Sequence, residues 1–318
     1  MKSKEFRAFV AQLGALTFVQ RNALVTALSS KGSANDVVGL IETEFVKAPM
    51  CGHCGSDKFY RWGVATALKR YKCRACGRTF NALTGTPLAH LHKRELWLDY
   101  ARALVDGVSL RKAATRVGVH LETSFRWRHR FLAAAKNDKA SAVTGIVEAD
   151  ETFILKSAKG SKKLIGRAPR KRGGKAKKGL STDEHDAILI VRDRYGATTD
   201  EMLPDLKAKT FAAYLAPIVA KDAVLVSDGR DAYGAFAHAA HILHVPIITS
   251  RSEHVYEGFH IQNVNAYTSR FKGWLRPFNG VASKYLPSYL GWRRTIERDG
   301  ERFTPQRCLQ AAFACRST

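Results

Sequence analysis

The sequence has few acidic residues for its length. Its 318 residues include 28 Asp and Glu against 52 Lys and Arg, which gives a formal net charge of +24. That excess argues against a typical metabolic enzyme, because a long-range positive field attracts polyanions such as nucleic acids or anionic lipids. Long hydrophobic runs are lacking too: no stretch approaches the roughly 20 apolar residues of a membrane span. We therefore expect a nucleic acid as the polyanion and no membrane association.

Signal-peptide character and disulfide-rich composition are also absent. The first four residues, Met-Lys-Ser-Lys, precede apolar residues, but Phe6, Phe9, Val10 and Leu13 fall at helical spacing and two glutamines interrupt the stretch. This pattern favours an amphipathic helix over a signal sequence. Six cysteines are too few for a disulfide framework in a chain of this size, and four of them form two CxxC pairs. We therefore predict a reducing cytoplasmic location.

The composition changes along the chain and predicts a multidomain protein. Apolar residues make up 45% of it, an ordinary globular share. We predict a helical N-terminal region at 1–47, a cysteine-bearing segment of short strands at 48–82, helices at 83–137 and an α/β domain at 138–318. In the α/β domain, strands are expected at Val143–Leu155, Ala187–Val191, Ala223–Ser227 and Val245–Thr249, and helices at Phe211–Ala220 and Ala232–Ala240.

A strongly basic stretch, Lys156–Gly179, separates the first two of these strands. It has eleven Lys or Arg, several glycines and no acid, so we expect a mobile loop that contacts a DNA backbone. The candidate DNA-binding residues in this loop are Lys162, Lys163, Arg170, Lys171 and Arg172.

The two CxxC pairs predict a zinc ribbon. Cys51 and Cys54 are followed, after eighteen residues, by Cys73 and Cys76, and a glycine comes directly after each pair. Two thiolates three residues apart on a tight turn hold one side of a tetrahedral Zn²⁺, and the second pair closes a structural site. The alternatives are buried free thiols or two redox motifs. His53 could compete as a ligand, while Cys308 and Cys315 are expected to be core residues.

A helix-turn-helix is indicated between residues 107 and 132. Ser109 is the expected N-cap of a first helix, and Gly118 is expected to relieve strain where the chain reverses. The second helix, Glu122–Leu132, carries Arg126, Arg128 and Arg130. A helix in a DNA major groove needs such a cationic face. The alternative is an ordinary helical hairpin whose charged face is solvated.

Acidic residues in or after two expected strands indicate a divalent metal site. Glu148 and Asp150 share one face of the first strand, and a buried acid is costly unless a metal or cation partners it. Asp228 ends the strand Ala223–Ser227 and precedes Gly229. Acids at the ends of different strands can converge on Mg²⁺ ions that activate a water or 3′-hydroxyl. Without further support, strand-end caps or ion-paired acids are the better explanation.

A resemblance across nearly the whole chain changes that balance. The chain resembles insertion-sequence transposases of the 1595 family, the ISXO-like group. In the first half, the likeness lies in the segment from Cys73 to Phe80, the motif Thr84-Gly85-Thr86, Trp97 and the helix-turn-helix. The likeness continues in the second half of the chain. It includes the motifs Glu148–Thr152, His260–Asn265, Phe271–Leu275, Gly280–Ala282 and Lys284–Leu286, with Tyr289, Leu290 and Trp292.

The resemblance implies an RNase H-like catalytic domain with an acidic triad that binds Mg²⁺ or Mn²⁺. Asp150 corresponds to its first member and Asp228 to its second. Asn265, which thirty-six intervening residues separate from Asp228, stands where related transposases carry Glu, and its amide offers a metal an oxygen but no charge. Glu253 and Glu257 are nearby alternatives for the third position.

The combined prediction is a bacterial, nucleoid-associated transposase that acts as a homo-oligomer on double-stranded DNA. The zinc ribbon and helix-turn-helix would bind terminal inverted repeats, and the α/β domain would cleave transposon ends and join them to target DNA. Two alternatives remain open. A zinc-containing transcriptional regulator would have Asp150 and Asp228 far apart, and a metal-dependent nuclease would cut without joining.

Overall fold

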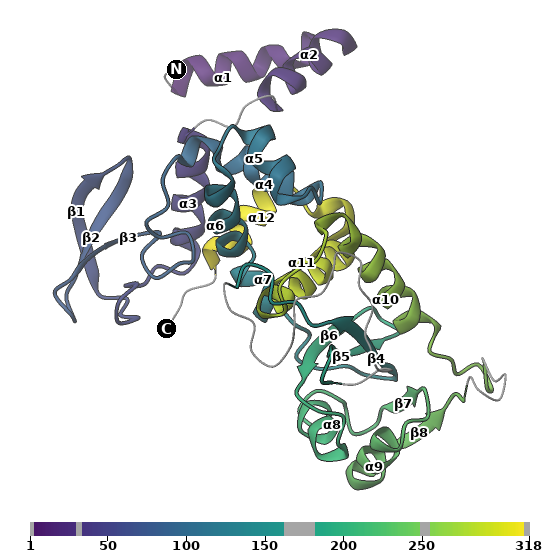
Figure 1. Cartoon of the computed structure of the whole chain (residues 1–318). Helices are drawn as coiled ribbons and strands as arrows, with labels where there is room; N and C mark the ends of the chain where they lie inside the picture. The colour runs from purple at the N-terminus through teal and green to yellow at the C-terminus, as the bar shows by residue number, and fades with distance from the viewer. Residues whose placement is uncertain (1–2, 30–33, 162–181, 249–254, 315–318) are drawn as a thin grey trace. The chain divides into compact units, whose positions relative to one another are not determined.

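The computed structural model describes residues 3–29, 34–161, 182–248 and 255–314, and the chain divides into two compact units (Figure 1). The first unit comprises Met1–Asp106, Ala113–His120 and Thr304–Thr318, and the second comprises Gly107–Lys112 and Leu121–Phe303. Short 3₁₀ helices lie at Leu13–Ala15, Arg94–Leu96, Arg276–Phe278, Ser283–Tyr285 and Gly300–Arg302.

The first unit begins with two helices, α1 (Ser3–Gln12) and α2 (Phe18–Ser29). The backbone N–H of Thr17 donates to Gln20 Oε1 at 2.9 Å, and the N–H of Gln20 donates to Thr17 Oγ1 at 3.3 Å. This reciprocal pair is a capping box, which fixes the start of α2. The helix α1 confirms the helical interpretation of the N-terminus, and it has no buried residue.

A three-stranded antiparallel sheet follows the next helix, α3 (Ala34–Lys47). Its strands are β1 (Phe59–Ala65), β2 (Leu68–Cys73) and β3 (Thr79–Asn81). Aromatic rings hold one face of this sheet against α3: the ring of Phe45 lies 5.1 Å from Tyr71 and 6.0 Å from Phe59, measured between centroids. Such ring pairs add stability beyond the apolar area that they bury.

The C-terminal helix α12 (Pro305–Ala314) packs against α3 and α4 (Trp97–Val105), so it belongs to the first unit. Trp97 is fully buried and lies 6.5 Å from the ring of Phe313. Cys308 is buried in the same helix, which confirms its expected place in a core. The last residues of the segment predicted as the α/β domain, 138–318, therefore belong to the first unit.

The second unit contains a five-stranded mixed sheet with the order β6-β5-β4-β7-β8. β4 pairs antiparallel with β5 and parallel with β7, which in turn pairs parallel with β8. The mixed sheet and its helices confirm the α/β prediction. The strands are β4 (Ile146–Leu155), β5 (His185–Asp193), β6 (Thr198–Leu203), β7 (Val224–Ser227) and β8 (Leu243–Pro246).

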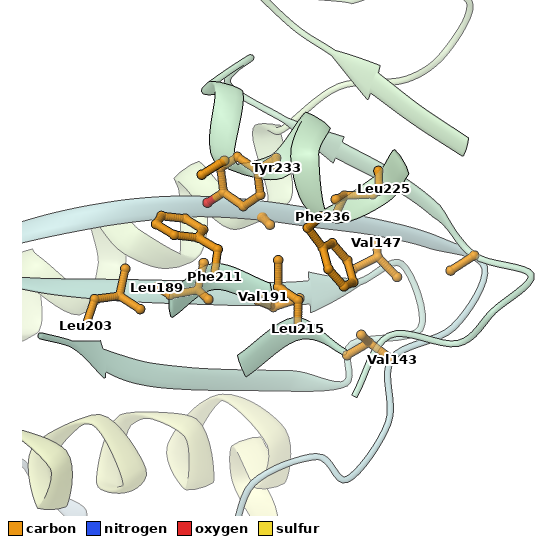
Figure 2. Packing of buried hydrophobic residues seen from close by; sticks show 14 of the residues in the cluster. Val143, Val147, Leu189, Val191, Leu203, Phe211, Leu215, Leu225, Tyr233 and Phe236 are labelled. Atoms are coloured by element: carbon orange, nitrogen blue, oxygen red, sulfur yellow. The ribbon is translucent and has the colours of Figure 1, made fainter. Parts of the chain in front are cut away.

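Helices cover both faces of this sheet (Figure 1). Val147 of β4, Leu189 of β5 and Leu225 of β7 pack against α8 (Ala208–Leu215) and α9 (Asp231–Ala240) in a hydrophobic core (Figure 2). On the other face, Ile188, Ile190 and Val226 pack against α10 (Gln262–Leu275) and α11 (Leu286–Asp299). Because side chains alternate along a strand, the even-numbered residues of β4 face α10 and the odd-numbered ones face α9.

The segment 137–142, which precedes the α/β sheet, docks on the edge strand β6. Lys139 Nζ donates to the carbonyl oxygen of Asp200 at 2.5 Å, and Ala140 N–H donates to Thr198 at 3.4 Å. A buried ion pair between Asp200 and Arg294 of α11 holds the same strand, and Arg294 also donates to Ala135 of the short helix α7 (Ala133–Asn137) at 3.1 Å. These contacts fix the entry of the chain into the α/β sheet.

Candidate metal centres

Asp150 and Asp228 meet because β7 ends where β4 continues. The parallel register of these strands ends with Ala149 opposite Ser227, so Asp150 and Asp228 are the next residues on each strand. Gly229 then turns the chain at a φ of +83°, a conformation that side chains other than glycine rarely adopt. The N–H of Arg230 donates to Asp228 Oδ1 at 3.1 Å, which orients that carboxylate.

Three carboxylates converge at this point. Oxygens of Asp150, Glu151 and Asp228 all lie within 4.8 Å of one another. The structure therefore brings together the two aspartates that the sequence singled out and adds Glu151, which was not predicted. Strand alternation places Glu151 on the face opposite Asp150, and its longer side chain still reaches the cluster where β7 has ended. Its position directly after Asp150 was the only signal in the sequence.

The electrostatics of the cluster favour a bound cation. Burial raises the pKa of Asp150 to about 6, and the negative charge of Asp228 adds to the effect. Burial likewise raises the pKa of Glu151 to about 7, although Arg230, whose Nε lies 3.0 Å from Glu151, opposes the shift. A divalent ion offsets both causes, because it attracts the carboxylates and replaces their lost solvation. These clustered carboxylate oxygens suit Mg²⁺ or Mn²⁺.

Glu148 accepts hydrogen bonds from the N-terminus of α10. Its side chain is fully buried on the face that α10 covers. Glu148 Oε2 accepts hydrogen bonds from the backbone N–H groups of Asn263 at 2.8 Å and Val264 at 3.1 Å, and Oε1 accepts one from the Asn263 side chain at 2.7 Å. Arg194 Nε lies 3.7 Å away. Glu148 therefore supplies the acceptor that the free N–H groups at the start of α10 need.

Asn265 lies in the first turn of α10, directly after the residues that Glu148 holds, and its side chain is exposed. Lys272 is seven residues further on and so shares a face of the helix with Asn265. The positive charge of Lys272 lowers the pKa of Asp150. Of the alternatives for the third ligand, Glu257 is exposed outside the carboxylate cluster and Glu253 lies outside the described residues.

The four expected cysteines form a second cluster, in the first unit. Their sulfurs lie within 4.8 Å of one another; Cys51 Sγ is 3.8 Å from Cys76 Sγ, and Cys54 Sγ is 3.6 Å from Cys73 Sγ. Gly55 and Gly77 have φ of +74° and +68°, and their N–H groups donate back to Cys51 and Cys73. The four-cysteine arrangement fits one tetrahedral Zn²⁺. The ring of His53 points elsewhere, with Nε2 3.3 Å from the Thr79 carbonyl oxygen.

The predicted helix-turn-helix segment contains two helices, α5 (Leu110–Val117) and α6 (Leu121–Phe131). Lys112 N–H donates to Ser109 Oγ at 3.4 Å and Gly118 has a φ of +72°, so the predicted cap and turn are present. The boundary between the two compact units falls in the turn, after His120.

Only two of the three predicted DNA-contacting arginines in α6 are exposed. Arg126 pairs with Glu122 at 3.3 Å on the surface, and Arg130 is exposed as well. Arg128 is fully buried: it donates to the carbonyl of Val108 at 2.7 Å and lies over the rings of Phe278 and Trp292. The assignment of Arg128 to DNA binding is therefore wrong, because its guanidinium is buried against aromatic rings of the second unit and is not exposed at the surface of α6. The basic-loop residues Lys162, Lys163, Arg170, Lys171 and Arg172 lie outside the described residues.

The second unit is thus an α/β domain with a carboxylate cluster, suited to a divalent metal, where β7 ends beside β4. Residues 142–293 match the family model of the ISXO2-like transposase domain. In this segment the chain is therefore similar to the IS1595 family of transposases. The match contains the carboxylate cluster and Asn265.

The chain is 26% identical over 247 residues to an uncharacterized protein in transposable element ISH50 of Halobacterium salinarum, and the alignment covers 76% of this chain and 82% of that protein. A crystal structure of a pre-cleavage Mos1 transpososome aligns with 70% of this chain and 79% of its own at 13% identity, with a TM-score of 0.25, which is too low to support a structural argument. In the described part of the chain, no helix is long and apolar enough to cross a membrane.

Proposed function

We propose that this chain is a DNA transposase that binds the terminal inverted repeats of its element, hydrolyses the DNA at the element's ends and joins the freed 3′-hydroxyl to target DNA. The observation that carries the proposal is the convergence of Asp150 and Asp228 within the transposase domain. A transcriptional regulator has no need for this convergence. The net charge of +24 supports a DNA substrate.

We infer an RNase H-like catalytic domain, supported by the strand order β6-β5-β4-β7-β8 and the antiparallel second strand. Asp150 and Asp228 would hold the divalent ions. Bound Mg²⁺ or Mn²⁺ supplies activation of a water or 3′-hydroxyl and stabilisation of the leaving oxygen. Asn265 would orient the reacting groups through its amide, and Glu148 holds the helix turn on which Asn265 lies. Lys272 is a candidate partner for a phosphate near Asp150.

The other parts of the chain would bind DNA. Zn²⁺ would hold the ribbon of β1–β3 together through the four cysteines, and the ribbon with α5 and α6 would bind the terminal repeats as a helix-turn-helix module. Arg126 and Arg130 are the exposed cations of α6. The basic stretch Lys156–Gly179 would contact phosphates without reading sequence. Neutralising several of its cations should therefore reduce the slope of the logarithm of the DNA-binding constant against the logarithm of salt concentration by about 0.9 per lost phosphate contact. An oligomer on the DNA of a bacterial nucleoid completes the proposal.

The decisive experiment uses the zinc-loaded full chain with Mg²⁺ and a labelled duplex that carries the element's end and its flanking DNA. A transposase yields both cleaved ends and joined products, whereas a nuclease yields free ends alone. A regulator binds the duplex and leaves it intact.

The third metal ligand can be assigned with variants in the same assay. Asn265→Ala should slow cleavage by a factor of about 10², the low end for a lost preorganised contact. Asn265→Glu restores the commoner acid and should keep activity. Near-normal cleavage by Asn265→Ala, with Glu257→Ala or Glu253→Ala folded but inactive, would assign the role to that acid instead.

A further inference from the structure

One face of the β1–β2 hairpin carries exposed aromatic rings. α3 covers the opposite face through Phe45. On the uncovered face, the side chain of Tyr60 is 37% exposed and that of Trp62 is 48% exposed, with their ring centroids 5.8 Å apart. Trp62 lies at a β-bulge between Arg61 and Gly63, where an extra residue interrupts the register with β2. Exposed large aromatics that lie side by side indicate a binding surface.

Cations lie against both rings. Lys72 Nζ is 4.7 Å from the centre of the Trp62 ring, and Arg74 Cζ is 5.0 Å from that of Tyr60. Lys72 is also the cross-strand partner of Tyr60, so the strand pairing itself puts ring and charge together. We call this surface, made of Tyr60, Trp62, Lys72 and Arg74, the hairpin face.

The hairpin that carries this face is strongly basic, although Glu42 of α3 pairs with one of its cations, Lys69, at 3.8 Å. Residues 58–81 contain seven Lys or Arg and no Asp or Glu. One of the seven, Arg70, donates to Thr79 Oγ1 of β3 at 3.1 Å. A surface of this kind attracts phosphates, and its flat rings offer π-faces to which nucleobases can stack.

We propose that the hairpin face binds unpaired DNA bases by stacking on Tyr60 and Trp62, while Lys72 and Arg74 contact the adjacent phosphates. Single-stranded DNA fits better than duplex, because the base faces of a duplex are already stacked on one another and only their edges are open in the grooves. The inference rests on the proposed function in one respect: DNA cleavage generates ends whose bases can separate.

Binding of the full, zinc-loaded chain to a labelled 16-nucleotide single strand, and to the duplex of the same sequence, tests the proposal. Trp62→Ala and Tyr60→Ala should each weaken binding of the single strand by about tenfold, the loss expected for one stacked base. Binding of the duplex should change less than twofold. Trp62→Phe should keep most of the affinity. Tyr195→Ala, which removes an 84% exposed ring in the second unit, is the matched control and should change neither affinity.

Tryptophan emission gives a second measurement, since Trp62 is the exposed one of the five tryptophans: Trp97, Trp127 and Trp292 are buried and Trp274 is half-buried. The single strand should quench the emission of the wild type and quench that of Trp62→Phe much less. Unchanged single-strand affinity in both alanine variants would overturn the proposal, as would an equal loss for single strand and duplex. If the wild type cleaves its end duplex while these variants bind the single strand normally, only this inference fails. If the wild type binds neither form of DNA, the proposed function fails with it.

Discussion

Replacing Glu148 by alanine should destabilise the second unit and loosen the start of α10. The variant removes a charged acceptor from two backbone N–H groups, those of Asn263 and Val264, and from the Asn263 side chain. Hydrogen bonds to charged groups contribute about 1.5–3 kcal/mol each, but their contributions do not add fully. Breaking a buried charge interaction costs about 3–5 kcal/mol, and we expect a loss in that range.

Glu148→Gln should be milder. Its amide oxygen can still accept both backbone N–H groups, and rotation of the Asn263 amide can restore the third bond. Only the charge is lost, so a cost of about 1–2 kcal/mol is expected, the difference between charged and neutral hydrogen bonds. Glu122→Ala is the matched control, since its 72% exposed side chain makes a surface ion pair and its removal should cost less than about 1 kcal/mol.

Two measurements test this reasoning. Urea denaturation gives the change in the free energy of unfolding. Hydrogen exchange of peptides that cover Gln262–Leu275 reports on α10 itself, and exchange should accelerate in Glu148→Ala and much less in Glu148→Gln. Wild-type protection of α10 in Glu148→Ala, with an unchanged unfolding midpoint, would show that Glu148 does not hold the helix.

Three further predictions concern the zinc site, α6 and the carboxylate cluster. Cys73→Ser should lose the zinc that metal analysis finds in the wild type, and full zinc occupancy in the variant would refute the ligand set. Arg128→Ala should lower the free energy of unfolding by about 2–4 kcal/mol, because it removes a charged hydrogen bond and two aromatic contacts. Arg126→Ala should change the free energy of unfolding by less than about 1 kcal/mol and should weaken DNA binding. Equal stability of the two variants would contradict the buried position of Arg128. Asp150 and Glu151 have raised pKa values of about 6 and about 7, so both carboxyls must lose a proton before they can bind a metal at low pH. Calorimetry should therefore show that Mn²⁺ binding releases protons and that the Mn²⁺ affinity rises from pH 5 to pH 8. An affinity independent of pH would argue against these ligands.

Local signals in the sequence predicted local structure well. The cap at Ser109, the turn at Gly118 and the glycines after each CxxC pair each depend on a few adjacent residues, and each is present. Apolar runs located most strands of the second unit for the same reason, since a buried strand needs continuous apolar residues. The convergence of Asp150 and Asp228 was predictable because each follows or lies in such a strand.

Features that depend on distant partners were missed. The strand β6 reads Thr-Thr-Asp-Glu-Met-Leu and lacks a hydrophobic pattern, because its buried Asp200 is neutralised by Arg294, 94 residues away. Arg128 has the composition of a DNA-binding residue, and only the fold shows that aromatic rings cover it. Glu148 was recognised as an acid in need of a partner, but the sequence does not show that the partner is a helix that begins 114 residues later.

The most direct test of catalysis at the carboxylate cluster is single-turnover cleavage of the end duplex by Asp228→Ala in the presence of Mg²⁺. Asp231→Ala is the matched control, since Asp231 is exposed at the start of α9 and lies outside the cluster. The account predicts that Asp228→Ala binds the duplex as the wild type does and yields no cleaved product, while Asp231→Ala cleaves normally. Cleavage by a folded Asp228→Ala at the wild-type rate would contradict it.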